Sequence, residues 1–156
     1  MQLRRGCRGW QLMALAFLAD QGTKFWVRQL SGRRELIPGV LRCRPVRNSG
    51  MAFSMLSGHF WLLTLATAAI IAALVIWLLK KPDEPPLVRA GFWMIAGGGL
   101  GNLVDRVLYG SVTDFLELEF AHFAIFNVAD IFVCVGAALA ALGILLSERG
   151  RERGAV

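Results

Sequence analysis

Two aspartates, Asp114 and Asp130, stand beside long apolar segments, and no lysine or arginine lies within a few residues of either one. Two carboxyl groups that are brought close together cannot both ionise cheaply, so they share one proton and one of the two pKa values rises. Such a pair can activate a water molecule and protonate an amide leaving group. Asp114 and Asp130 are therefore the candidate catalytic pair for a hydrolytic reaction.

Other polar side chains occur near the ends of the apolar segments, several of them at helical spacing. Asp20 and Lys24 are four residues apart, so they share a helix face and can neutralise each other. A charged side chain within a membrane span is costly unless it is paired or hydrated, which makes each one a functional candidate. The candidates for supporting the site or contacting substrate are Asp20, Lys24, Asn48, Asn102, Asp105, Arg106 and Asn127.

Other chemistries lack the residues that they require. Neither His59 nor His122 lies among the polar candidates, so no serine–histidine–acid set forms, and no HExxH motif is present. The glycine-rich stretch at 97–102 does not follow a strand, which argues against a nucleotide site. The three cysteines have no metal-ligand spacing. The sequence therefore predicts no metal and no cofactor.

Long apolar segments must position these residues. Hydrophobic residues make up 56% of the 156 residues, and twenty residues without a charge run from 60 to 79. About 20 apolar residues cross the hydrocarbon core of a membrane as a helix. A second apolar segment, 126–147, contains one acid. Two weaker apolar segments, 10–27 and 88–108, carry charges near one end.

We therefore predict an all-α integral membrane protein with four transmembrane helices, at about residues 10–28, 58–79, 88–109 and 126–147. The chain, 1–156, is expected to form a single membrane-embedded domain, with a small extracytoplasmic β element from the first and third loops. The apolar run that follows the basic N-terminus also fits a secretory signal peptide. No small-residue cleavage site stands out after it, so we favour an uncleaved first helix.

The net charge of +6 is explained by basic residues that flank the spans. Nine of them fall on the side of the two termini and the second loop, and seven fall in the first loop or near the third. Lysine and arginine are more abundant on the cytoplasmic side of membrane proteins, so both termini are predicted to be cytoplasmic. This distribution argues against binding to nucleic acid.

The up-and-down topology brings the polar candidates together. The end of the first helix, the start of the second, the end of the third and the start of the fourth all meet the same membrane face. That face is the one opposite the termini, and scattered structural polar residues would not be expected to gather there. A proton-coupled transporter is the alternative, but it would need an acid near the midplane, and the helix at 60–79 has none.

The loops carry two patterns that predict strands. Residues 36–46 and 112–120 alternate apolar and charged side chains, although two prolines weaken the first pattern. Opposite charges on neighbouring strands attract, so we expect Arg42 and Arg44 to face Glu117 and Glu119. Residues 51–56 are compatible with a short interfacial helix, and the charged C-terminal tail is expected to be mobile.

The motifs DQGTK (20–24), RNSGMAFS (47–54), GGGLGNLVDR with GSVTDF (97–115) and FNVAD (126–130) resemble, in order, those of the lipoprotein signal peptidases, or signal peptidase II family. The resemblance extends over all four predicted helices. Two departures from the family pattern are Met51 and Ile131, where a small residue and a serine are usual.

The resemblance implies a bacterial inner-membrane aspartyl endopeptidase with its active site near the outer leaflet. It would remove the signal peptide from prolipoproteins by cleaving N-terminal to a diacylglyceryl-modified cysteine. Its partners would be these lipid-modified substrates and membrane lipid, and we expect a monomer. By the same resemblance Asp114 and Asp130 are catalytic, and the supporting residues are Asp20, Lys24, Asn48, Gly50, Asn102, Asp105, Arg106 and Asn127.

Overall fold

The structure is a computed structural model, and it describes residues 9–50, 60–121 and 123–154. The described chain contains four long helices and a three-stranded antiparallel sheet. In chain order the elements are α2 (Trp10–Val27), β1 (Arg34–Ile37), β2 (Leu41–Asn48), α3 (Phe60–Lys80), α4 (Pro86–Tyr109), β3 (Val112–Leu118) and α5 (Val128–Gly154).

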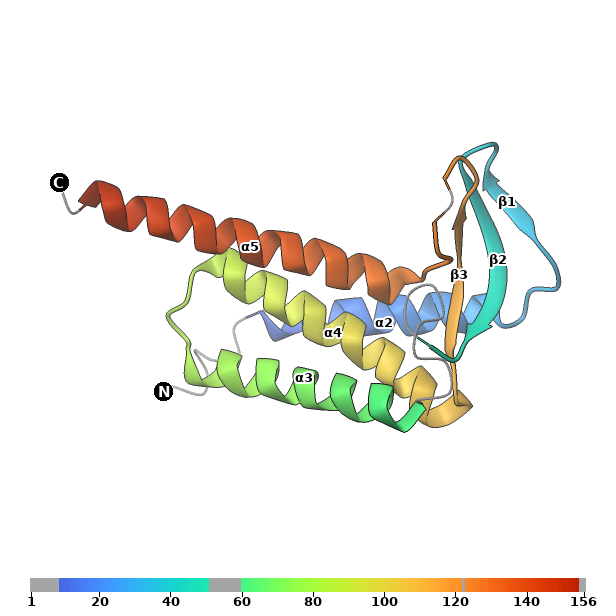
Figure 1. Cartoon of the computed structure of the whole chain (residues 1–156), viewed down its shortest axis with the longest axis horizontal. Helices are drawn as coiled ribbons and strands as arrows, with labels where there is room; N and C mark the ends of the chain where they lie inside the picture. The colour runs from blue at the N-terminus through green and yellow to red at the C-terminus, as the bar shows by residue number, and fades with distance from the viewer. Residues whose placement is uncertain (1–8, 51–59, 122, 155–156) are drawn as a thin grey trace.

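The helices form an elongated bundle, and the sheet covers one end of it (Figure 1). The α4 helix lies at the centre of the bundle and packs against α2, α3 and α5. The start of α2 and the far end of α5 lie at the end of the bundle opposite the sheet. The predicted up-and-down arrangement thus places the sheet at the end where α2 and α4 finish and α5 begins.

Three of the four described helices, α3, α4 and α5, are long and apolar enough to cross a membrane. The α2 helix is 18 residues long and contains buried Asp20 and Lys24, which lower its hydropathy. The helices also expose large apolar side chains on their outer faces, as expected for contact with lipid. The structure therefore supports a helical membrane protein with three apolar spans, and a fourth span formed by α2 stays a prediction.

Small residues allow α4 to approach its neighbours closely. A side chain at Gly91 would collide with the backbone of Gly136 on α5, and one at Gly101 would collide with the Asp20 carboxylate on α2. Small residues at such crossings are the usual means by which membrane helices pack tightly. The close approach brings the polar ends of α2, α4 and α5 together.

The sheet has the order β1-β2-β3 and contains the charge pairs that the sequence predicted. The Arg42 Nε lies 2.8 Å from a Glu119 carboxylate oxygen, and the Arg44 Nη1 lies 2.9 Å from a Glu117 carboxylate oxygen. The Arg44–Glu117 pair joins β2 to β3, and Glu119 directly follows β3, in which Glu117 is opposite Arg42. The expected attraction across the sheet is therefore confirmed.

One expectation outside the bundle is corrected. The pattern at 36–46 is not one strand but the hairpin between β1 and β2, because Gly39 takes a positive φ of 71° and the chain turns at Pro38–Gly39. The α5 helix continues into the C-terminal tail as far as Gly154, and the expected mobility of that tail stays a prediction. The proposed interfacial helix at 51–56 lies outside the described residues.

Candidate active site

Asp114 lies in β3 with only 3% of its surface exposed. The Asn48 Nδ2 donates a hydrogen bond of 2.8 Å to its Oδ2, and the Asn127 Nδ2 donates one of 2.7 Å to its Oδ1. Residues 112 to 115 of the strand are all buried, and this burial, which disfavours the charged form, raises the pKa of Asp114 to about 6. The two amide bonds and Lys24 act in the opposite direction, and the charge of Asp130 adds to the rise.

Asp130 lies in the first turn of α5 and is only partly buried. The Asn102 Nδ2 donates to its Oδ1 at 2.9 Å, and the backbone N–H of Asn127 donates to its Oδ2 at 3.1 Å. Its own backbone N–H donates in return to the Asn127 side chain at 3.0 Å. This reciprocal pair is a capping box in which the acid is an aspartate, and it fixes both residues at the helix start.

Asn127 and Asn102 connect the two aspartates. The Asn127 side chain binds Asp114 while its backbone binds Asp130. The Asn102 Oδ1 accepts from Asn127 at 3.1 Å and from the Lys24 Nζ at 2.8 Å. Among the described residues, the ion pairs do not include Asp114 or Asp130. Amide groups, and not cations, therefore hold both candidate carboxylates.

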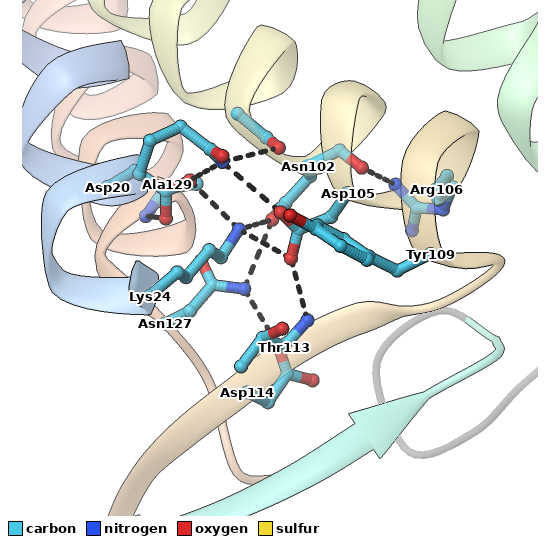
Figure 2. Close-up of polar contacts among 12 residues, drawn as sticks. Asp20, Lys24, Asn102, Asp105, Arg106, Tyr109, Thr113, Asp114, Asn127 and Ala129 are labelled. Atoms are coloured by element: carbon cyan, nitrogen blue, oxygen red, sulfur yellow. Dashed lines mark hydrogen bonds and ion pairs between the residues drawn. The ribbon is translucent and has the colours of Figure 1, made fainter. Parts of the chain in front are cut away.

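A second group of acids lies deeper in the bundle and is held by cations (Figure 2). The Lys24 Nζ lies 2.9 Å from the Asp20 Oδ2 and 3.6 Å from the Asp105 Oδ2, and all three side chains are fully buried. The predicted neutralisation of Asp20 by Lys24 is confirmed. We call Asp20, Lys24, Asp105 and Arg28 the charged cluster.

Asp20 also holds the start of α5. Its Oδ1 accepts a hydrogen bond of 2.9 Å from the backbone N–H of Ala129, which lies in the first turn of that helix. Helix N-termini carry unsatisfied N–H groups and a partial positive charge, so a carboxylate is stabilising there. Asp20 thus fixes α5 immediately beside Asp130.

Three further predicted residues, Asn48, Gly50 and Arg106, lie near Asp114 and Asp130. The backbone N–H of Gly50 donates to the Asn48 side chain at 2.9 Å, which orients Asn48 toward Asp114. Arg106 makes long contacts of 3.4 Å with the backbone oxygens of Asn102 and Gly50. The ion pairs of Asp105 are with Lys24 and Arg28 among the described residues.

Arg28 is the site residue that sequence reasoning missed. Its Nη2 lies 2.7 Å from the Asp105 Oδ1, a distance typical of a strong charge-assisted hydrogen bond. The sequence analysis counted Arg28 only among the basic residues that flank the spans. The available signal was its spacing: Gln21, Lys24 and Arg28 are three and four residues apart, which places them on one face of a helix.

The two candidate carboxylates open into one cavity of about 450 Å³. Its polar wall consists of Asn48, Asn102, Arg106, Asp114 and Asp130. Its other wall is apolar and is formed by the segment 123–126 and by residues of α5 such as Ile131 and Val135. A largely apolar cavity with a few convergent polar groups is the usual form of a ligand site.

In this helical membrane bundle, two carboxylates that are held by amides instead of cations lie at one largely apolar cavity. These are the parts of a membrane-embedded aspartic peptidase. The chain matches the model of the signal peptidase (SPase) II family over residues 12–146. It is 39% identical to the lipoprotein signal peptidase of Shewanella loihica over 92% of this chain and 89% of the relative. It is 37% identical to that of Streptococcus agalactiae over 78% and 81% of the two chains.

The fold agrees with these matches. A solved bacterial membrane enzyme superposes with a TM-score of 0.81 and 30% identity over 88% of this chain and 87% of the other. The chain belongs to the signal peptidase II family, whose members are proteases of the aspartic type. This membership confirms the predicted peptidase and does not favour the transporter alternative.

Proposed function

We propose that this protein is a lipoprotein signal peptidase that cleaves its membrane-bound substrate with Asp114 and Asp130. The observation that carries the proposal is the cavity itself. It brings together two carboxylates that are 16 residues apart in sequence, holds both with amides, and faces them with an apolar wall. The family membership supports the reaction, and the name of its relatives supports a lipoprotein precursor as the substrate.

In the proposed mechanism Asp114 carries the proton of the pair and Asp130 is ionised. Asp114 is the more buried of the two, and burial favours its neutral form. Asp130 takes a proton from a water molecule, whose oxygen attacks the scissile carbonyl carbon while Asp114 donates its proton to the carbonyl oxygen. When the tetrahedral intermediate collapses, the peptide C–N bond breaks and the leaving nitrogen receives the proton held by Asp130. Asp114 takes back a proton from one hydroxyl of the intermediate as the product carboxyl group forms.

The supporting residues hold the two carboxylates in position. Asn48 and Asn127 orient Asp114, and Asn102 orients Asp130. Asp20, Lys24 and Asp105 fix the helices behind them. Gly50 orients Asn48, and Arg106 brings a positive charge to the cavity wall, where it faces the substrate.

The apolar wall fits the lipid on the substrate. We propose that the diacylglyceryl chains lie against residues 123–126 and α5, and that cleavage occurs N-terminal to the modified cysteine. The protein would act as a single membrane-embedded domain with four spans, both termini in the cytoplasm and the cavity near the outer leaflet of a bacterial inner membrane. All the groups in the mechanism come from one chain, so a monomer suffices.

The test is a cleavage assay with the purified protein in lipid or detergent. A precursor that carries a diacylglyceryl-modified cysteine should be cut to two products whose masses place the break immediately before that cysteine. The matched control is the same precursor without the lipid, which should remain uncut. Equal cleavage of both precursors, or no cleavage of either, would contradict the proposed substrate.

A further inference from the structure

Arg28 contacts three elements at the end of the bundle. It follows α2 directly, its Nη2 binds the Asp105 Oδ1 of α4, and its Nε donates a 3.1 Å hydrogen bond to the Thr113 hydroxyl of β3. The guanidinium also lies 4.2 Å from the centre of the Tyr109 ring, a cation–π distance. One side chain thereby ties α2 to α4 and to the strand that carries Asp114.

These contacts close a triangle. The backbone N–H of Thr113 donates to the Asp105 Oδ2 at 2.9 Å, while the Asp105 Oδ1 receives Arg28 (Figure 2 shows the Asp105–Thr113 side). Arg28 completes the third side through the Thr113 hydroxyl. Asp105 is fully buried and the Arg28 side chain is 26% exposed. The position of Thr113 is thus fixed through both its backbone and its side chain.

Thr113 is the neighbour of Asp114 in β3, so fixing Thr113 also fixes the backbone that carries Asp114. Successive side chains of a strand point to opposite faces. Ser111 and Thr113 line a cavity of about 310 Å³ that Arg28 also borders. Val112 and Asp114 instead line the active-site cavity. Arg28 therefore lies behind β3, and a twist of the strand that moved Thr113 would also move the Asp114 carboxylate on its other face.

We propose that Arg28 is a positioning residue of the catalytic site, which clamps Thr113 to Asp105 and so sets the place of Asp114. The inference rests on the proposed catalytic role of Asp114. It requires an arginine: the guanidinium presents donors in a fixed fork, here one to Thr113 and one to Asp105, whereas a lysine offers a single flexible ammonium group.

The first variants separate charge from geometry. Arg28→Lys keeps an ion pair with Asp105 but loses the bond to Thr113, and Arg28→Gln loses the charge as well. We expect kcat for the lipid-modified precursor to fall about ten-fold in Arg28→Lys and further in Arg28→Gln, while KM changes by less than about two-fold. Small misplacements of a reacting group reduce the rate strongly, and the substrate-binding wall is untouched. Unfolding measurements should show Arg28→Lys close to the wild type.

The second variant removes the same bond from the other end. Thr113→Val keeps the shape of the side chain and deletes only the hydroxyl. We expect it to reduce kcat about as much as Arg28→Lys, and we expect the double variant to fall no further, because both changes break one interaction. Arg33→Gln is the control, since it removes an exposed positive charge from the connection between α2 and β1.

Several outcomes would overturn the inference. Wild-type kcat in Arg28→Lys, a multiplicative loss in the double variant, a higher KM at unchanged kcat, or an equal loss in Arg33→Gln would each do so. If Arg28→Gln does not fold, the kcat values of Arg28→Lys, Thr113→Val and their double variant still test the inference. Asp114→Asn is assayed in parallel: activity in that variant would refute the proposed pair and the inference with it, whereas an inactive Asp114→Asn beside normal Arg28 variants would refute the inference alone.

Discussion

The two groups of acids at the end of the bundle differ in what holds them. Asp20 and Asp105, in the charged cluster, are bound by the cations Lys24 and Arg28. Asp114 and Asp130, at the cavity, are bound by amide groups. The two groups are joined by one side chain, Asn102, which accepts from Lys24 and donates to Asp130.

The type of partner, cation or amide, indicates which acids can change their protonation state. A cation donates hydrogen bonds and stabilises only the ionised carboxylate. An asparagine side chain can donate through its NH₂ group to a carboxylate or accept through its oxygen from a protonated carboxyl group. Amide partners therefore tolerate either state of Asp114 and Asp130, which an acid–base pair requires, while the ion pairs of the charged cluster hold the helices.

The largest expected effect is the loss of catalysis when either member of the pair is neutralised. Asp114→Asn and Asp130→Asn should each lower kcat by about 10²–10⁴-fold or more, because each removes an acid or base from the reaction. The assay is cleavage of the lipid-modified precursor. Asp83→Asn, an exposed acid between α3 and α4, is the control and should cleave normally.

The Asp114→Asn variant should not weaken the fold. The pKa of Asp114 is raised from 3.8 to about 6, so the folded state holds its proton more tightly than the unfolded state. Stability therefore falls as the pH rises from about 4 to 6, and at pH 7 the ionised Asp114 is unfavourable. Asp114→Asn should be as stable as the wild type or more so. Substantial cleavage by a folded Asp114→Asn protein would remove the distinction between the two groups.

The next effect concerns stability. Asp20→Asn leaves Lys24 buried with only the more distant Asp105 as its acid, and we expect the free energy of unfolding to fall by about 3 kcal/mol. The measurement is reversible unfolding in mixed micelles. The folded fraction should keep part of its activity, since Asp20 does not line the cavity. Complete inactivity with normal stability would move Asp20 into the catalytic group.

A third effect is on the pH profile. If Asp114 supplies the proton, kcat/KM should fall about ten-fold for each pH unit above about 6, because the pair then loses its last proton. The charges that act on Asp114 are Asp130 of α5, Lys24 of α2 and Arg106 of α4. The profile is measured with the precursor assay at constant ionic strength. A flat profile between pH 5 and 8 would contradict the assignment of the proton to Asp114.

The smallest effect is expected in the sheet. Arg44→Gln removes a partly exposed pair with Glu117, and such pairs contribute about 0–1 kcal/mol. Both the unfolding free energy and kcat should stay close to the wild type. A large loss of activity would show that the sheet charges, and not only the charged cluster, position Asp114 and Asp130.

Much of this arrangement was predictable because a membrane restricts the chain strongly. The lengths of the apolar segments predicted the helices. The alternating direction of the predicted spans placed Asp114 and Asp130 at one end of the bundle, and in the structure both line one cavity. Charge alternation gave the pairing of β2 with β3. These predictions rest on periodicity and length, which are local properties of the sequence.

The contacts that were missed depend on three-dimensional approach. The Asp20 carboxylate reaches Ala129 across 109 residues, and Arg28 reaches Thr113 across 85. No local pattern reports such distances. The hairpin at Pro38–Gly39 was missed for another reason: alternation continued on both sides of the turn, so the positive φ of Gly39 was hidden within an apparently continuous strand.

The bond between Asp20 and Ala129 has a consequence for how the protein is made. It joins the first described helix to the start of the last, so it forms only after nearly the whole chain has been synthesised and inserted. Contacts between residues far apart in sequence also form late, because the intervening chain must first lose its freedom. Until α5 docks, Asp130 has no fixed place opposite Asp114. With these two residues as the proposed catalytic pair, the nascent chain carries no assembled protease while it is still being translated.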